Sequence, residues 1–197
     1  RWAKQQLPDD LREELETIKD DEGAIYDRFC KDLAFGTSGL RGKMGVGSNM
    51  INSIVLRRAT DGVSDYLLSR HERPKVVVSY DTRLKLADNG VDVLIFAEPT
   101  PVPVLSFAIR ELSADGGIMI TASHNPREYN GYKVYDHFGN QINDEKARII
   151  EEYIEKRDYF GRSADPAADK MSGVAGNEPS HVQPAEIKLL DNRVRNS

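Results

Sequence analysis

Residues 117–126 read GIMITASHNP and join a compact apolar stretch to a turn. The segment Ile118–Ile120 is typical of a buried strand, and the Asn-Pro pair that begins at Asn125 predicts a turn directly after it. Ser123 is therefore expected on an exposed loop at the end of a strand. In α/β proteins, ligands bind where strands reach their carboxyl ends. Ser123 is then either a turn residue or a nucleophile held at the tip of a strand.

Outward from this stretch, two further segments are rich in β-branched residues and predict strands. They are Lys75–Tyr80 (KVVVSY) and Val91–Phe96 (VDVLIF). Apolar residues at helical spacing predict amphipathic helices between and around the strands. The predicted helices cover residues 7–18, 24–33, 53–67, 99–112 and 144–154, with Asn52 or Ser53 capping the third and Asn143 the last.

Apolar strands that alternate with amphipathic helices predict the fold class, an α/β protein with a mixed sheet flanked by helices. Residues 132–135 and the FGNQI segment at 138–142 are expected to form a hairpin pair. We divide the chain into a domain at residues 1–160 and a second part at 161–197. The second part is rich in Ala, Asp, Ser, Gly and Pro, and is expected to be a tail, a linker or a remnant of a further domain.

One connection is too short for this fold. Ten residues separate the predicted strands at 75–80 and 91–96, whereas a parallel crossover with a helix needs about a dozen or more. Either these strands are not parallel neighbours, or residues are missing between them. The second explanation is favoured.

The composition is ordinary for a globular protein, and it excludes some classes of function. The 197 residues are 39% hydrophobic and carry a net charge of -5, which argues against a nucleic-acid partner. No apolar run approaches the about 20 residues of a membrane helix. The first residues, RWAKQQLPDD, lack the apolar segment of a signal peptide, and the single cysteine excludes an internal disulfide. A cytoplasmic protein is expected.

The other polar residues suggest an anion site more than a hydrolase or a zinc site. HExxH is absent, the glycine-rich segment 35–47 does not fit a Walker A loop, and TASHNP does not fit the G-x-S-x-G elbow. Arg41 lies in that glycine-rich segment, and Lys133 follows ten residues after Ser123. A serine hydroxyl with Arg, Lys and His124 nearby suits phosphoryl transfer. Taken singly, each has a bland alternative as a turn serine, a surface charge or a loop histidine.

Several motifs in one order resemble a known family. They are FGTSGLRG at 35–42, DTR at 81–83, TASHNP at 121–126 and NGYKVY at 130–135. Together they resemble the first domain of the α-D-phosphohexomutases, the phosphoglucomutases, phosphomannomutases and related phosphopentomutases. The resemblance covers residues 33–160, with a weaker match in the N-terminal helices.

The resemblance implies a phosphate on Ser123 in the resting enzyme. This phosphate would pass to a free hydroxyl of a sugar phosphate and make a bound bisphosphate. The bisphosphate would reorient and return its other phosphate to the serine, so that a 1-phosphate becomes a 6-phosphate or the reverse. A hexose 1,6-bisphosphate would act as activator.

The resemblance also implies roles for the neighbouring residues. Arg41 and Lys133 would be the acid/base and charge-stabilising groups, and His124 would line the site. Loop contacts to the substrate are expected from Thr37, Ser38 and Asn125. An oxygen of the phosphate on Ser123 would be one ligand of Mg²⁺.

The family has four domains, and three of its site elements are not found in this sequence. They are an aspartate-rich D-x-D-x-D metal loop, an E-x-S sugar-reading loop and a C-terminal phosphate-binding loop. The chain is therefore expected to be one part of the enzyme that does not complete the reaction alone. Phosphoglucomutase is the favoured parent activity. Phosphomannomutase, phosphopentomutase or a non-catalytic sugar-phosphate-binding module are the alternatives, and the oligomeric state is not predicted.

Overall fold

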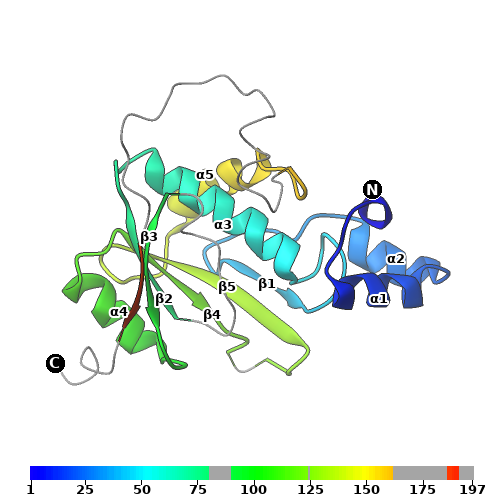
Figure 1. The fold of residues 1–197 in the computed structure, drawn as a ribbon, viewed down its shortest axis with the longest axis horizontal. Coiled ribbons are helices and arrows are strands. Elements are labelled where there is room, and N and C mark those ends of the chain that lie inside the picture. The colour runs from blue at the N-terminus through cyan, green and yellow to red at the C-terminus, as the bar shows by residue number, and fades with distance from the viewer. Residues whose placement is uncertain (80–89, 124, 162–185, 191–197) are drawn as a thin grey trace.

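A mixed sheet forms the centre of the protein. The computed structural model describes residues 1–79, 90–123, 125–161 and 186–190, and these form a six-stranded sheet in the order β1-β5-β4-β2-β3-β6 (Figure 1). The parallel strands are β2, β3, β4 and β6, and β5 runs antiparallel to both of its neighbours, β4 and β1. The strands are β1 (Leu40–Lys43), β2 (Lys75–Ser79), β3 (Asp92–Phe96), β4 (Gly116–Ile120), β5 (Tyr129–Asp136) and β6 (Ile187–Leu190). The prediction of a mixed α/β sheet is confirmed.

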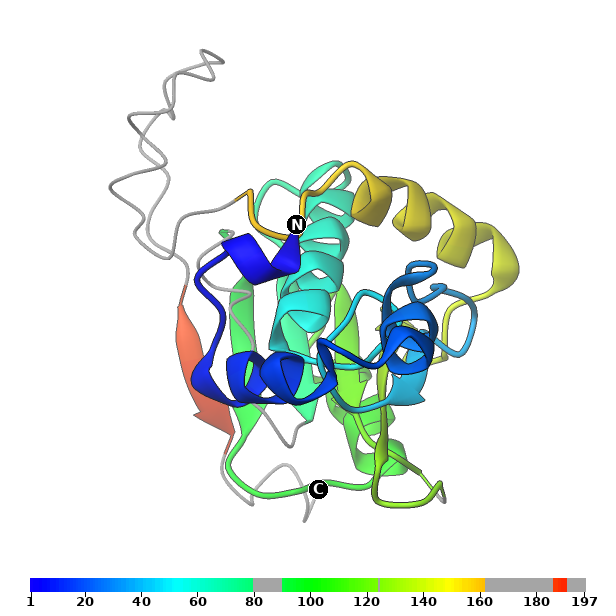
Figure 2. The same ribbon diagram turned by 90° about the vertical axis from the view of Figure 1, so that its right-hand side faces the viewer.

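Helices cover both faces of this sheet. Two of them, α3 and α5, lie on one face, and α4 lies on the other (Figures 1 and 2). A short 3-10 helix, η1, and the helices α1 and α2 lie at the β1 side of the molecule (Figure 1). The helices are η1 (Trp2–Lys4), α1 (Asp9–Ile18), α2 (Glu22–Phe29), α3 (Ser53–Leu68), α4 (Val102–Glu111) and α5 (Asp144–Glu155). No helix among the described residues is long and apolar enough to span a bilayer.

The sheet separates two apolar cores, because successive residues of a strand point to opposite faces. On the α3 and α5 side, the larger core includes the buried strand residues Val76, Val78, Ile118, Ile120, Tyr132 and Val134. On the α4 side, the smaller core includes Val77, Phe96, Leu105, Ile109, Met119 and Tyr135. The strand that precedes Ser123 is thus buried on both faces, and this fixes the place where it ends.

The two helices on the larger core begin at asparagine caps, as predicted. Asn52 Oδ1 accepts a hydrogen bond from Val55 N at 3.0 Å, and Asn143 Oδ1 accepts one from Lys146 N at 3.0 Å. These bonds satisfy N–H groups that the first turn of a helix leaves without a partner. Both caps are local bonds; the sequence left Asn52 or Ser53 open for α3, and the structure selects Asn52.

The glycine-rich segment after α2 contains a strand that was not predicted. Residues Leu40–Lys43 form β1, which pairs with β5. The loop after β1 is held from two sides. Glu14 of α1 accepts hydrogen bonds from Val46 N at 2.7 Å and from Arg28 Nη1 at 2.5 Å. Asn52 Nδ2 donates to the carbonyls of Gly45 and Gly47 at 2.8 and 2.9 Å. The N-terminal helices therefore help to position β1.

Three details differ from the sequence-based expectations. β5 begins at Tyr129, and FGNQI contributes only the single bridge between Tyr135 and Gln141, so no paired hairpin strand forms there. α2 ends at Phe29, earlier than the expected 33. Residues 187–190, within the part expected to be a tail, a linker or a remnant of a further domain, form the unpredicted strand β6 parallel to β3. The division at residue 160 itself stays a prediction.

The structure answers one of the two questions about the short connection between β2 and β3. β2 and β3 are parallel neighbours, with Val77 opposite Leu94, so the alternative in which they are not adjacent is wrong. The connection itself lies mostly outside the described residues, as do DTR at 81–83 and Tyr80, the expected end of β2. The expectation that residues are missing between the two strands stays a prediction.

Candidate active site

Ser123 lies three residues beyond the end of β4, on an exposed loop. Its backbone is left-handed, with φ of 57°, a conformation that it shares with Ser113 among the described non-glycine residues. The Ser123 N–H donates to Thr121 Oγ1 at 3.0 Å, and Asn125 N–H donates to the Ala122 carbonyl at 3.1 Å. A non-glycine residue in this region costs about 1–3 kcal/mol and is held only where its surroundings require it. The loop is thus a hydrogen-bonded turn, and it holds the serine where the parallel strands reach their carboxyl ends.

Two cations lie on adjacent strands next to this edge. Arg41 of β1 is paired with Gly131 of β5, and Lys133 follows two residues after Gly131. Residues that pair across strands, and residues two apart on one strand, share a face of the sheet. Arg41 and Lys133 are therefore diagonal neighbours on one face, where such pairs stand about 7–8 Å apart. This face is the one on which Tyr135 packs with α4.

The electrostatics of this pair favour an incoming anion. Partial burial and then the positive charge of Arg41 lower the pKa of Lys133 below its ordinary value. Among the residues that the structure describes, neither cation forms an ion pair with a carboxylate. Two like charges held together without a counter-ion raise the energy of the empty site, and a bound anion relieves that repulsion.

Two glycines near these cations stand in close contact with the backbone of neighbouring strands. Thr121 N donates to the Gly131 carbonyl at 3.0 Å, so Gly131 lies between the Ser123 loop and Arg41. A Cβ at Gly131 would come within 3.1 Å of the Thr121 carbonyl oxygen. Gly39, just before β1, has φ of 70°, and a Cβ there would overlap the Tyr132 carbonyl oxygen. At both positions a side chain would press on the backbone of a neighbouring strand.

Sequence reasoning missed a third cation on this face. Lys43 is paired with Tyr129, the first residue of β5, and follows Arg41 by two residues. Arg41, Lys43 and Lys133 therefore share one face. The alternation in LRGK is the signal that would have identified Lys43, had this glycine-rich segment been interpreted as a strand.

The expected loop contacts lie in different places. Asn125 is half-buried in the turn that follows Ser123. Thr37 and Ser38 occupy the centre of a tight turn closed by two hydrogen bonds between Gly36 and Gly39, at 2.7 and 3.2 Å. This turn precedes β1 and so lies at the opposite end of that strand from the Ser123 edge. There Gln141 Nε2 donates to the Thr37 carbonyl at 2.5 Å.

His124 lies outside the described residues, so its expected place in the site stays a prediction. The described residues contain no group of three or more His, Cys, Asp or Glu side chains able to hold a metal ion. The expectation that a phosphate oxygen on Ser123 is one ligand of Mg²⁺ stays a prediction.

The chain is similar in sequence to proteins of one family. Residues 32–160 match the family model described as phosphoglucomutase/phosphomannomutase, alpha/beta/alpha domain I. A phosphoglucomutase of Staphylococcus epidermidis is 40% identical over 135 residues, which are 63% of this chain and 25% of that protein. A phosphoglucomutase of Staphylococcus saprophyticus is 33% identical over 176 residues, which are 84% of this chain and 30% of that protein. The chain thus spans between a quarter and a third of the length of these relatives.

Solved structures support the same fold. A crystal structure from Thermus thermophilus, of a protein assigned as a phosphomannomutase, has 31% identity and a TM-score of 0.60 and covers 83% of this chain and 34% of that one. A phosphoglucomutase/phosphomannomutase family protein from Burkholderia thailandensis has a TM-score of 0.57 at 22% identity, and covers 84% of this chain and 34% of that one. At that identity the second likeness supports the fold alone.

Proposed function

Because the chain belongs to the phosphoglucomutase/phosphomannomutase family, we propose that it carries the phosphoserine of a phosphohexomutase. Ser123 is the phosphoryl carrier, and the reaction interconverts a sugar 1-phosphate and a sugar 6-phosphate through a bound bisphosphate. The relatives named as phosphoglucomutases favour glucose phosphates as the substrate class. The sheet flanked by helices provides the frame, and the rest of such an enzyme provides the remaining site elements.

One observation carries this proposal. An exposed serine with a strained backbone ends a strand that is buried on both faces, next to two cations without a carboxylate partner among the described residues. A phosphorylated serine supplies the negative charge that this arrangement lacks. A serine that served only as a turn residue gives no reason to hold two cations against one another.

In the transfer step, the bond between the Ser123 oxygen and phosphorus breaks as a bond from a sugar hydroxyl oxygen to phosphorus forms. The sugar hydroxyl releases its proton to water, and the serine oxygen gains one from Lys133, which then takes up a proton from water. Arg41 keeps its proton throughout and balances the charge of the phosphoryl oxygens. Lys133 is the proton donor to the serine oxygen in this direction and the acceptor in reverse, because its lowered pKa eases proton exchange.

Mg²⁺ and a hexose 1,6-bisphosphate activator complete the proposal. A phosphate oxygen on Ser123 is the one metal ligand we assign to this chain, because the described residues contain no carboxylate cluster. When bound, the ion would add positive charge beside the transferring phosphoryl group. The single cysteine of the sequence fits a cytoplasmic enzyme.

The test is to locate a phosphoryl group. The purified protein is incubated with glucose 1,6-bisphosphate, and its intact mass and fragment masses are measured for the wild type, Ser123→Ala and Ser113→Ala. Ser113 is the matched control, because it is also an exposed serine with a left-handed backbone, φ of 48°. We expect one phosphoryl group on Ser123 in the wild type and in Ser113→Ala, and none in Ser123→Ala.

A phosphoryl group at another residue, or undiminished labelling of Ser123→Ala, would contradict the carrier role. Binding of the bisphosphate to the wild type without any phosphoryl transfer would favour the alternative function, a non-catalytic sugar-phosphate-binding module. Lys133→Ala tests whether Lys133 serves phosphoryl transfer or the stability of the fold. We expect it to slow labelling by at least about a hundredfold while leaving the melting temperature nearly unchanged.

A further inference from the structure

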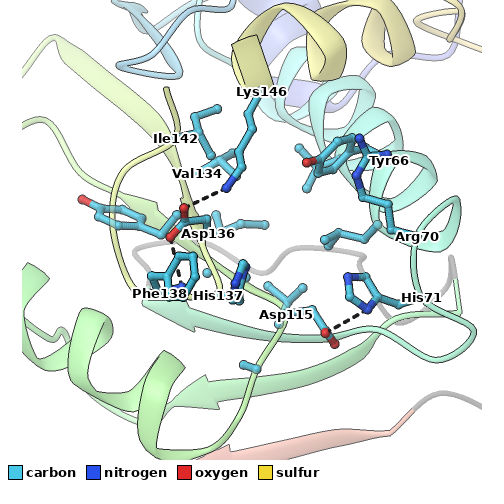
Figure 3. Close-up of a pocket in the computed structure, with 18 of the residues that line it drawn as sticks. Tyr66, Arg70, His71, Asp115, Val134, Asp136, His137, Phe138, Ile142 and Lys146 are labelled. Atoms are coloured by element: carbon cyan, nitrogen blue, oxygen red, sulfur yellow. Dashed lines mark hydrogen bonds and ion pairs between the residues drawn. The ribbon is translucent and has the colours of Figure 1, made fainter. Parts of the chain in front are cut away.

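A cavity lies at the opposite end of the strands from Ser123. It has a volume of about 600 Å³ and is lined by the first residues of β4, the end of β5, the C-terminal half of α3 and parts of α5 (Figure 3). Gly116, the first residue of β4, lines it. Ser123 follows seven residues later, which corresponds to about 20 Å along an extended chain. The cavity is therefore separate from the candidate active site.

The inner wall of this cavity is apolar. It is formed by core side chains from both helices and the sheet, among them Val63, Leu67, Val76, Ile118, Val134 and Ile142. Two aromatic residues also line it, the buried Tyr66 of α3 and the exposed Phe138 of the turn after β5. Phe138 is 60% exposed, which is uncommon for so large an apolar side chain. A cavity of this size and lining fits a small molecule with an apolar, flat body.

The charged groups around the opening are of two kinds. Two carboxylates already have partners, since Asp136 accepts a hydrogen bond from Lys146 at 2.8 Å and Asp115 lies 3.1 Å from His71 Nδ1 (Figure 3). Figure 3 shows Tyr66 and Arg70 on the other side of the cavity from Val134 and Asp136.

Two guanidinium groups have no carboxylate partner within the described parts of the chain. Arg70 stacks on the Tyr66 ring at 4.3 Å and contacts Ser69 Oγ at 3.4 Å. Arg110 donates to Ser106 Oγ at 3.1 Å and to the Phe138 carbonyl at 3.3 Å. Both keep free N–H positions for an anion, because a guanidinium has five donors. Their planar donor groups suit a carboxylate or a sulfonate.

We propose that this cavity binds a small molecule with a flat apolar body and one negatively charged group. The body lies against the apolar wall and the Tyr66 ring, and the anionic group is held by Arg70, which stacks on that ring. Three cations, Arg70, Arg110 and Lys146, face two carboxylates at the opening, which leaves one positive charge to be balanced. A ligand with two or more negative charges would meet repulsion from Asp115 and Asp136.

Two fluorescent probes test this proposal directly. The first is 8-anilinonaphthalene-1-sulfonate, which has an aromatic body and one sulfonate. The second, N-phenyl-1-naphthylamine, has the same body without the charge. Each is titrated into the protein, and amide shifts in two-dimensional NMR spectra locate its site. We expect saturable binding of the sulfonate with shifts at Gly116, Val134 and Ile142, and binding of the neutral probe at least about tenfold weaker.

Variants identify the groups that hold the anion. Arg70→Gln should weaken sulfonate binding by about tenfold and leave the neutral probe unaffected, and Arg110→Gln, on the α4 side of the cavity, should weaken it less. Arg148→Gln is the matched control, because Arg148 is exposed on α5, pairs with Glu152 and does not line the cavity. Its affinity should equal that of the wild type, and circular dichroism shows whether each variant is folded.

Four results would overturn the proposal. Three of them are equal affinity for the two probes, sulfonate binding that Arg70→Gln leaves unchanged, and amide shifts that fall outside the cavity. The absence of saturable sulfonate binding to the wild type would also overturn it. None of these outcomes depends on the phosphoryl-transfer proposal for Ser123.

Discussion

The polar side chains on the two faces of β5 differ in whether they have a partner of opposite charge or a hydrogen bond. On the face under α3 and α5, the Tyr132 hydroxyl is fully buried and accepts a hydrogen bond from Thr60 Oγ1 at 3.3 Å. On the same face Asp136 pairs with Lys146 at 2.8 Å. On the other face Lys133 stands beside Arg41, a charge of the same sign. One strand thus carries satisfied polar groups on one side and a charge repulsion on the other.

The difference indicates which face is built for stability and which for binding. A buried polar group without a partner costs about 1–3 kcal/mol, so the packed face satisfies its polar groups. The Lys133 face is only partly covered by α4, and water screens part of the repulsion there. Substitutions on the packed face should therefore lower stability, and substitutions on the open face should change anion binding.

The largest loss of stability is expected from Asn52→Ala, at the start of the helix that covers the packed face. The variant loses the cap bond to Val55 N and the Asn52 Nδ2 bonds to the Gly45 and Gly47 carbonyls, and Gly47 keeps only the long bond from Met50 N at 3.4 Å. We expect a loss of about 3 kcal/mol in the free energy of unfolding, measured with urea. Asn143→Ala removes a cap bond alone and should cost about 1 kcal/mol. Equal losses would show that the two carbonyl bonds do not matter.

The next largest loss of stability is expected from Gly62→Ala, because the added methyl group forces α3 and α5 apart. A Cβ at Gly62 would lie 2.7 Å from both N and Cα of Ile154, so the helices must move apart. We expect a loss of about 2 kcal/mol, even though alanine favours the helix itself. Gly23→Ala in α2 is the matched control. Its Cβ would make an ordinary contact at 3.4 Å, so this variant should be more stable by up to about 1 kcal/mol. A stable Gly62→Ala would contradict tight packing of the two helices.

A smaller effect is expected from Asp136→Asn, and it depends on pH. Burial alone would raise the pKa of Asp136, but hydrogen bonds from Lys146 and from the Asn140 and Phe138 N–H groups outweigh it and hold the pKa below 3.8. The Asp136 contribution is therefore complete above pH 3.8 and is lost as the pH falls further.

The variant should lose about 1 kcal/mol at pH 7 and show a weaker fall in stability below pH 4 than the wild type. Urea titrations at several pH values measure this difference. Glu152→Gln, in an exposed pair with Arg148, should leave the free energy of unfolding at pH 7 nearly unchanged. Parallel profiles for Asp136→Asn and the wild type would count against a role of this carboxylate in acid stability.

The smallest change in stability is expected from Lys133→Met, on the open face. Because the pKa of Lys133 is lowered by folding, its charge does not stabilise the protein at neutral pH. The free energy of unfolding should stay within about 0.5 kcal/mol of the wild type. Inorganic phosphate should raise the melting temperature of the wild type and not that of the variant, because ligand binding stabilises the folded state. A melting temperature that responds equally in both would contradict an anion site at Lys133.

The elements that the sequence predicted correctly are those with local signals. Val76–Val78 is apolar and β-branched and forms a buried strand. Asn52 and Asn143 cap helices because a side-chain oxygen reaches an N–H three residues ahead. The motif around Ser123 likewise combines a strand and a turn in adjacent residues. Such features need no information about distant parts of the chain.

The sequence by itself therefore determined the α/β class, the helix caps and the serine at the end of β4. Only the tertiary structure decided that LRGK is a strand, because its pairing partner β5 lies about 90 residues away and no β-branched residue marks it. The same pairing places Lys43 on the face of Arg41 and Lys133. Residues 187–190 became a strand through β3 in the same way. Strand pairing joins distant segments by backbone hydrogen bonds, and side-chain sequence alone does not encode which edge a short segment will meet.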